Sequence, residues 1–181
     1  MGNIQPMDPP PSKIGTKTKA GVGIAAMLAI AVPFTGSWEG ESLKPYWDNI
    51  GKVETVCRGD TQVVMRTYTH EECDKMLRDK LEKQYAPVVM KALPGIEDHR
   101  YAFAAFTDLA YNAGPGAVQQ SIARLWNGGQ YVAACHFISN YKLAGGKVIA
   151  GLVYRRDGLT GRIGEVDLCM VDAVPMQLGV E

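Results

Sequence analysis

Residues 38–51 read WEGESLKPYWDNIG, and residues 54–61 read ETVCRGDT. Around them the chain alternates short apolar and polar segments, at 42–46, 53–57 and 62–65, with glycines and an Asp-Asn pair between the segments. Alternation broken by turn residues predicts a small antiparallel sheet. Five acidic residues gather in this region: Glu39, Glu41, Asp48, Glu54 and Asp60.

Helical patterns follow the predicted sheet. Thr69 and Glu72 have the spacing of a capping box, and the apolar residues after them recur at helical intervals, so a long amphipathic helix is expected to end at Pro94. The sequence therefore predicts an α+β fold, with a small antiparallel sheet first and a mostly helical body after it. Further helices are expected at residues 98–111, 117–126 and 130–141.

The N-terminal part of the chain has a different composition. Residues 1–19 are rich in Pro, Gly and Lys, which predicts a basic, disordered leader that stays in the cytoplasm. Residues 20–38 contain no charged residue, and Lys13, Lys17 and Lys19 precede them. An uncharged segment behind a basic flank is typical of chains that enter a membrane with the flank inside. We therefore expect this segment to meet the inner membrane.

Residues 20–38 allow several interpretations. The small residues at 29–31 fit the cleavage site of a signal peptide. A permanent anchor is the second interpretation. The third is an uncleaved, weakly hydrophobic anchor that later leaves the bilayer, which the alanine and glycine content favours. A buried core helix would explain the apolar run but not the flanking lysines.

The composition excludes several function classes. The chain has 181 residues, enough for one domain, and its 19 Lys and Arg balance its 19 Asp and Glu, which argues against a nucleic-acid partner. The sequence contains no HExxH, no phosphate-binding glycine loop and no GxSxG, so we expect no metal and no cofactor. An even number of cysteines without zinc-ligand spacing favours disulfides in an oxidising compartment. These cysteines are Cys57, Cys73, Cys135 and Cys169.

The carboxylates suit acid chemistry on a sugar. Cleavage of a glycosidic bond needs one carboxyl that donates a proton and a second that activates water or stabilises positive charge. Glu39 follows an apolar segment and Asp48 lies in a polar turn, so the two carboxyls have different surroundings. The alternative is that these acids are solvated turn residues.

The quoted stretches resemble the active-site region of phage-type lysozymes, the glycoside hydrolase family of T-even phage lysozyme and the endolysins of lambdoid phages. The family pattern is Glu, eight residues, Asp, five residues, Thr. Glu39 and Asp48 have that spacing, whereas six residues separate Asp48 from Thr55 and Glu54 occupies the literal position. The Thr-x-Cys-x-Gly run at 55–59 is nevertheless present, which favours one inserted residue in the preceding turn.

The resemblance extends over nearly all of residues 38–170. Between Arg156 and Glu165 the chain is longer than the family pattern. The Tyr-Asn-Ala-Gly-Pro-Gly segment at 111–116 also occurs in lytic transglycosylases. The other matching positions are Tyr68–Thr69, Glu72–Cys73, Ala134–Cys135, residues 144–146, Gly151–Leu152, Arg155–Arg156, Glu165 and Cys169.

The resemblance implies a role for each matched site residue. Glu39 would be the general acid, Asp48 would activate water on the opposite face of the sugar, and Thr55 would assist that water in an inverting hydrolysis. Arg155 or Arg156 would pair with Glu39. The substrate would be the β-1,4 bond between N-acetylmuramic acid and N-acetylglucosamine in peptidoglycan, cut by a monomeric lysozyme-like domain, expected at 39–181, for host lysis.

Two other functions stay open at this point. A lytic transglycosylase would cut the same polymer through Glu39 without activated water. A membrane-tethered peptidoglycan-binding protein with an inactive site is compatible with the altered spacing between Asp48 and Thr55.

Disulfide pairing and location are also predicted. We predict the pairs Cys57–Cys73 and Cys135–Cys169, one of three connectivities that four cysteines allow. Residues 20–38 resemble the signal-anchor-release leader of some lambdoid endolysins. Such a leader implies an inactive form on the periplasmic side of the host inner membrane, followed by an active form in the periplasm.

Overall fold

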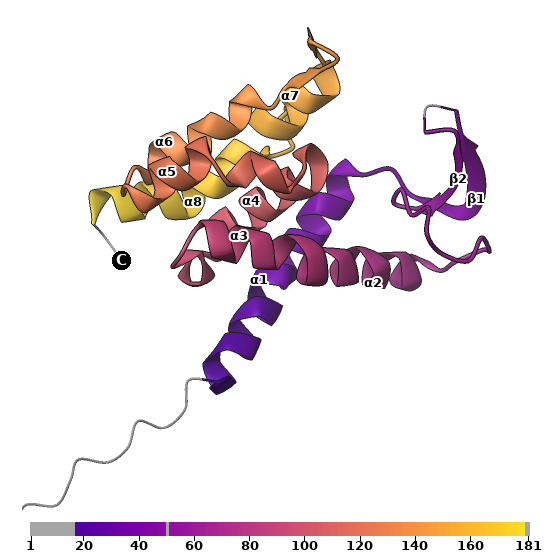
Figure 1. Cartoon of the computed structure of the whole chain (residues 1–181), viewed down its shortest axis with the longest axis horizontal. Coiled ribbons are helices and arrows are strands. Elements are labelled where there is room, and N and C mark those ends of the chain that lie inside the picture. The colour runs from indigo at the N-terminus through magenta and orange to yellow at the C-terminus, as the bar shows by residue number, and fades with distance from the viewer. Residues whose placement is uncertain (1–16, 50, 180–181) are drawn as a thin grey trace, which may run out of the picture.

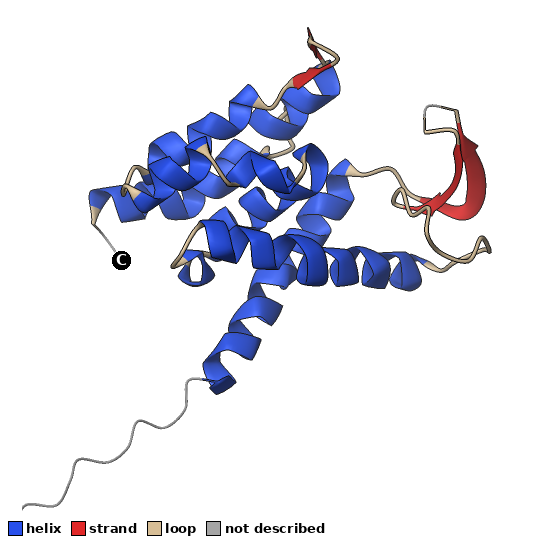
Figure 2. Cartoon of the chain, in the orientation of Figure 1, coloured by secondary structure: helices blue, strands red, loops and turns tan. Residues whose placement is uncertain are grey.

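The computed structural model describes residues 17–49 and 51–179. Residues 1–16, most of the predicted basic leader, lie outside the described part. The elements are α1 Lys17–Trp38, β1 Ser42–Asp48, β2 Val53–Cys57, α2 His70–Lys80, α3 Ala86–Ala92, α4 Arg100–Ala113, α5 Ser121–Asn127, α6 Tyr131–Phe137, β3 Leu143–Ala144, β4 Lys147–Val148, α7 Ala150–Asp157 and α8 Glu165–Leu178. The hairpin of β1 and β2 occupies one side of the molecule, and the rest is mainly helical, with the short pair β3 and β4 next to α7 (Figures 1 and 2).

The hairpin pairs β1 and β2 in antiparallel fashion, with Tyr46 opposite Thr55 and Asp48 opposite Val53. In its turn Lys52 has a φ of 55°, and its N–H donates to the Asp48 carbonyl at 2.7 Å. This left-handed residue lies in the turn where the family spacing calls for one inserted residue. The register is constant from the Asp48–Val53 pair to the Tyr46–Thr55 pair, and it shifts between Tyr46 and Ser42, which lies opposite Cys57.

The predicted third strand at 62–65 is wrong. Gly59, with a φ of 88°, reverses the chain directly after β2. Asp60 then forms an isolated two-bond bridge back to Val56, and residues 62–65 have no strand conformation. Because the edge of β2 is already used by this tight reversal, the alternating residues that follow have no strand to pair with.

The long helix after the hairpin begins and is interrupted as predicted. The Thr69 hydroxyl accepts the Glu72 N–H at 3.2 Å, and the Thr69 N–H donates to the Glu72 carboxylate at 2.9 Å, which completes the capping box. A π-helical turn, Leu81–Tyr85, separates α2 from α3. It places Pro87 in the first turn of α3, where a missing N–H is tolerated.

Helix α4 is the centre of the helical body. Its residues 102–110 are all buried, as expected for 98–111, and it packs against α8 and α1. The Asp172 carboxylate of α8 accepts the N–H groups of Tyr101 and Ala102 at 2.7 and 2.9 Å. The helix predicted at 117–126 starts only at Ser121, because residues 115–118 form a 3₁₀ turn after Gly114.

Helix α1 contributes one apolar face to the core, where it packs against α4 and α2. Residues 20–38, which the sequence predicted to meet the membrane, therefore occupy the position of a core helix in the folded domain. Among the helices that the structure describes, none combines the length and apolar character needed to cross a bilayer. From residue 23 onward, the buried residues of α1 are Met27, Leu28, Ala31, Phe34 and Thr35. Its exposed residues from 23 onward are uncharged, namely Ala25, Ala26, Ala29, Pro33 and Ser37.

Two disulfides fasten the peripheral elements. Cys57–Cys73 joins the end of β2 to α2, and Cys135–Cys169 joins α6 to α8. The predicted connectivity is confirmed. The first bridge fixes the hairpin against the helix that lines the site, and the second ties the C-terminal helix to the body.

Candidate active site

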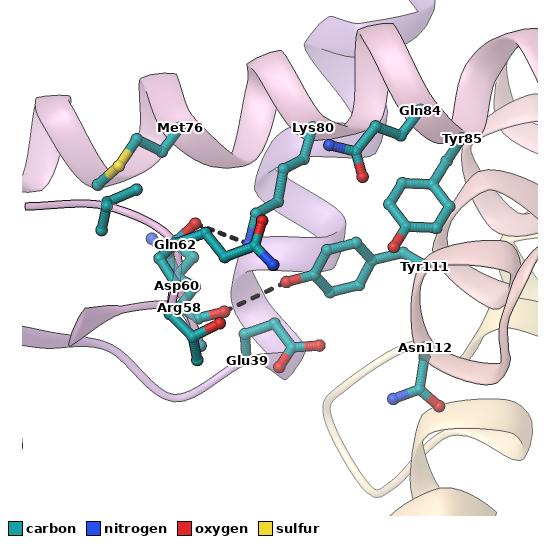
Figure 3. A pocket seen from close by; sticks show the side chains of 13 residues that line it. Glu39, Arg58, Asp60, Gln62, Met76, Lys80, Gln84, Tyr85, Tyr111 and Asn112 are labelled. Atoms are coloured by element: carbon teal, nitrogen blue, oxygen red, sulfur yellow. Dashed lines mark hydrogen bonds and ion pairs between the residues drawn. The ribbon is translucent and has the colours of Figure 1, made fainter. Parts of the chain in front are cut away.

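Glu39 lies between the hairpin and the helical body, directly after the last residue of α1. Its side chain is 23% exposed and lines two adjoining hollows of about 690 and 420 Å³. Figure 3 shows the Glu39 side chain below Tyr111 among the residues that line the larger hollow. The Asn112 side chain lies to the right of both. The larger hollow is also lined by Arg58, Gly59, Asp60, Thr61, Gln62, Val63, Met76, Lys80, Gln84 and Tyr85.

Most of this lining is polar. The Lys80 ammonium and the Asp60 carboxylate are 2.7 Å apart, and the Tyr111 hydroxyl donates to the Arg58 carbonyl at 3.2 Å (Figure 3). Burial, followed by the charges of Glu39 and Asp60, raises the pKa of Tyr111, so the phenol keeps its proton at neutral pH. Such a surface of fixed donors and acceptors suits a ligand rich in hydroxyl and amide groups.

Arg155 of α7 is the partner of Glu39. Its Nη1 lies 2.6 Å from the Glu39 Oε1, and its Nη2 and Nε donate to the two oxygens of Asp108 at 2.6 and 3.0 Å. Arg156 turns the other way, to Glu165 and Asn112. Of the two arginines proposed from the sequence, the structure brings only Arg155 to Glu39.

The buried cluster around Arg155 contains more acids than bases. Glu39, Asp108 and Glu165 face Arg155 and Arg156, and the side chains of Asp108 and Glu165 are fully buried. Burial and the neighbouring Asp108 raise the pKa of Glu165 well above its usual value. A protonated Glu165 removes one negative charge from a cluster that holds three acids and two arginines.

A Glu165→Gln variant tests this protonation state. A carboxyl whose pKa is raised by folding destabilises the fold as pH rises above its unfolded value of about 4.5, and Gln mimics the neutral carboxyl at every pH. We expect the wild-type protein to lose more unfolding free energy than the variant between pH 5 and pH 8. Urea unfolding at several pH values measures this difference. An equal change of unfolding free energy with pH in both proteins would show that Glu165 is ionised.

The hairpin places Thr55 and Glu54 on opposite faces. Directly opposed residues share a face of the sheet, as do residues two apart, so Asp48, Thr55 and Tyr46 lie on one face. Glu54, opposite Trp47, lies on the other face. Thr55 is buried and Glu54 is exposed.

The shared face is the one directed at Glu39. Tyr46 lines the smaller hollow together with Glu39, whereas Asp48 and Thr55 line neither of the two hollows. The structure thus brings Glu39 and Arg155 into contact, and it places Asp48 and Thr55 on the hairpin face of Tyr46 but outside the lining of both hollows. In the part of the chain that the structure describes, no cluster of His, Cys, Asp and Glu is arranged to hold a metal ion.

Comparison with known proteins shows the family. The family model described as "Phage lysozyme" matches residues 36–158, which include the hairpin, Glu39 and both arginines. The chain belongs to the phage lysozyme family. Among curated relatives, a SAR-endolysin of Enterobacteria phage P21 is 34% identical over 159 residues, covering 81% of this chain and 93% of the relative. A SAR-endolysin of Bacteriophage PS119 is also 34% identical, covering 75% and 82%.

Solved structures show the same fold as this phage lysozyme. The endolysin from Escherichia coli O157:H7 phage FAHEc1 has a TM-score of 0.64 at 22% identity, covering 78% of this chain and 90% of that chain. The active form of the P1 phage endolysin has a TM-score of 0.58 at 22% identity, covering 84% and 93%. The lysozyme-like architecture predicted from the sequence is confirmed.

The sequence analysis missed Asp108, the residue of this phage lysozyme that fixes Arg155. Its signal was present, because Asp108 is a single acid within the apolar run 101–111, which forms a helix buried on most sides. A carboxylate in such a position is retained only with a partner. Lys80 and Gln84, one helical turn apart on the helix that borders the larger hollow, were missed because nothing distinguishes them from surface residues in sequence.

Proposed function

We propose that this phage lysozyme cleaves peptidoglycan by inverting hydrolysis with Glu39 as the general acid. As an endolysin-type glycoside hydrolase it degrades the bacterial wall for host lysis, and the bond concerned is the β-1,4 link between N-acetylmuramic acid and N-acetylglucosamine. One observation carries the proposal. Glu39 lines a polar hollow while Arg155 and Asp108, both buried, fix its carboxyl from behind.

The proposed reaction uses the residues as follows. Glu39 gives its proton to the glycosidic oxygen as the bond from that oxygen to the anomeric carbon breaks. Water adds to the anomeric carbon from the opposite face, and Asp48 takes a proton from that water. Thr55, on the same face of the hairpin as Asp48, helps to orient the water.

Hydrolysis is favoured over the other two functions by the hairpin. A transglycosylase would need no second carboxylate, yet Asp48 and Thr55 share the sheet face that is directed at the Glu39 hollow. Mass spectrometry of digested peptidoglycan distinguishes the three. Hydrolysis leaves reducing N-acetylmuramic acid ends, a transglycosylase leaves anhydro ends, and a binding protein leaves the polymer uncut.

The role of Thr55 is testable because Val has the same shape without the hydroxyl. We expect Thr55→Val to lower kcat about tenfold or more, since it loses a group that orients water, and to leave the fold intact. Glu54→Gln, on the opposite face of the hairpin, is the matched control and keeps nearly full activity. Steady-state assays on purified walls check both, and a larger loss in the Glu54 variant would reverse the assignment.

We further propose that residues 20–38 act as a signal anchor that is later released. Two relatives are called SAR-endolysins. The exposed face of α1 carries small, uncharged residues such as Ala25, Ala26 and Ala29. The exposed face of a surface helix normally carries charged or polar residues instead. A helix of this kind tolerates both a bilayer and a place in the core, and collapse of the membrane potential would favour its exit.

Release also explains control of the enzyme. Glu39 is the first residue after α1, so anchoring of the helix in the inner membrane keeps Glu39 from Arg155. We expect an inactive membrane-bound form and an active periplasmic form of identical mass. Intact-mass measurement of both forms tests this, and loss of the residues up to about Ala31, the site that signal-peptide rules select, would show ordinary secretion instead.

A further inference from the structure

The C-terminal end of α1 needs cations that its own sequence does not supply. The last carbonyl groups of a helix have no partner within the helix, and this end carries the negative pole of the helix dipole. Helix α1 has no basic residue in its last turn, and the acidic Glu39 follows at once. The end of this helix therefore lies next to the proposed general acid without local charge compensation.

Arg58, which follows β2, supplies one cation. Its Nη1 donates to the Gly36 carbonyl at 2.7 Å, and its Nη2 lies 2.7 Å from the Asp74 carboxylate and 3.0 Å from that of Glu41. A Cβ at Gly36 would come within 3.2 Å of the Arg58 guanidinium carbon, so the glycine leaves space for this contact.

Arg162, in the loop between α7 and α8, supplies a second cation at the end of α1. Its Nη2 donates to the Ser37 carbonyl, and its guanidinium lies over the Trp38 ring, with 3.5 Å from Cζ to the ring centroid. Arg162 lines neither of the two hollows that Glu39 lines. It also lies beyond the family match at 36–158.

We propose that Arg162 is a positioning residue for Glu39. It holds Ser37 and Trp38, the two residues before Glu39, from a segment 125 positions away in sequence. Together with Arg58 it fixes the last turn of α1, so that the Glu39 carboxyl stays at Arg155. Small displacements of a reacting group cost large factors in rate, so an arginine outside the hollow can control kcat. The inference rests on the proposed role of Glu39.

Arg162→Ala tests the inference in the purified, soluble, full-length enzyme. We expect kcat on purified peptidoglycan to fall about tenfold with KM nearly unchanged, because the acid is misplaced while the hollow is intact. Arg162→Lys keeps a cation over Trp38 and should restore most of kcat. Arg100→Ala is the matched control, since it removes an arginine that lies over Tyr101, 5.2 Å from the ring centroid, at the start of α4.

The outcomes separate this inference from the proposed function. Wild-type kcat in Arg162→Ala overturns the positioning role, and so does a loss of kcat that Lys fails to restore and that matches the loss of thermal stability. Glu39→Gln is assayed on the same walls. An inactive Glu39 variant beside a fully active Arg162→Ala variant leaves the general acid in place and removes only the inference, whereas an active Glu39 variant overturns both.

Discussion

The Glu39→Gln variant is expected to lose about a thousandfold or more in kcat on purified peptidoglycan while it keeps its fold. The amide has the size of the carboxyl and its oxygen can still accept from Arg155, which donates at 2.6 Å in the wild-type enzyme. The amide cannot transfer a proton to the glycosidic oxygen. Reducing-end assays measure the loss, and circular dichroism with thermal unfolding checks the fold.

Glu41→Gln is the neighbouring control for this prediction. Glu41 is directed at Arg58 and His70 rather than at Arg155, so its amide variant should keep activity within a few-fold of wild type. If the Glu41 variant were inactive and the Glu39 variant active, the register of the active site would be shifted by two residues. The assignment of Asp48 would then fail as well.

Arg155→Met is expected to lower the free energy of unfolding by about 3–5 kcal/mol and to remove activity. The guanidinium is the partner of both Glu39 and the fully buried Asp108, and Met fills a similar volume without charge. Asp108 is then left buried without its bidentate partner. No solvent reaches the Asp108 carboxylate to replace the lost guanidinium. Burial lowers the pKa of Arg155, but Asp108 and Glu39 together outweigh this and raise it, so the wild-type side chain stays charged at any accessible pH.

Arg66→Met provides the matched comparison on the surface. Arg66 pairs with Glu72 at 2.6 Å, but the two side chains are 49% and 41% exposed, so water replaces the lost contact. We expect this variant to change the unfolding free energy by about 1 kcal/mol or less. Urea denaturation of both variants at pH 7 measures the difference. Equal losses would mean that the Arg155 cluster contributes no more than a surface ion pair.

Helix α1 shows how one segment satisfies two environments. Residues 20–38 of this helix carry no charge and follow Lys17 and Lys19, which indicated a membrane segment, whereas the place of the helix against α4 is that of a core helix. The two descriptions are compatible because Met27, Leu28 and Phe34 form one apolar face, while the opposite face is small and uncharged. Neither face would oppose insertion into a bilayer. In aqueous solution only the apolar face has to be packed against the core.

The sequence by itself determined the features that depend on neighbouring residues. The capping box at Thr69, the interruption at Pro87 and the buried run around residues 102–110 follow from local hydrogen bonding and periodicity. The spacing of Glu39 and Asp48 located the candidate site through the family resemblance. The same resemblance predicted the family, and the positions of the cysteines relative to the expected elements predicted both disulfides.

Only the tertiary structure decided which side chains meet. Arg155 and Arg156 are equivalent in sequence, and the choice of Arg155 depends on the direction in which α7 presents each one to α4 and to Glu39, 116 residues away. The strand pairing that puts Thr55 on the same face as Asp48, the reversal at Gly59 and the approach of Arg162 to Trp38 have the same origin. Local patterns repeat within a few residues, whereas these contacts depend on how whole elements pack, and packing is set by the complete core.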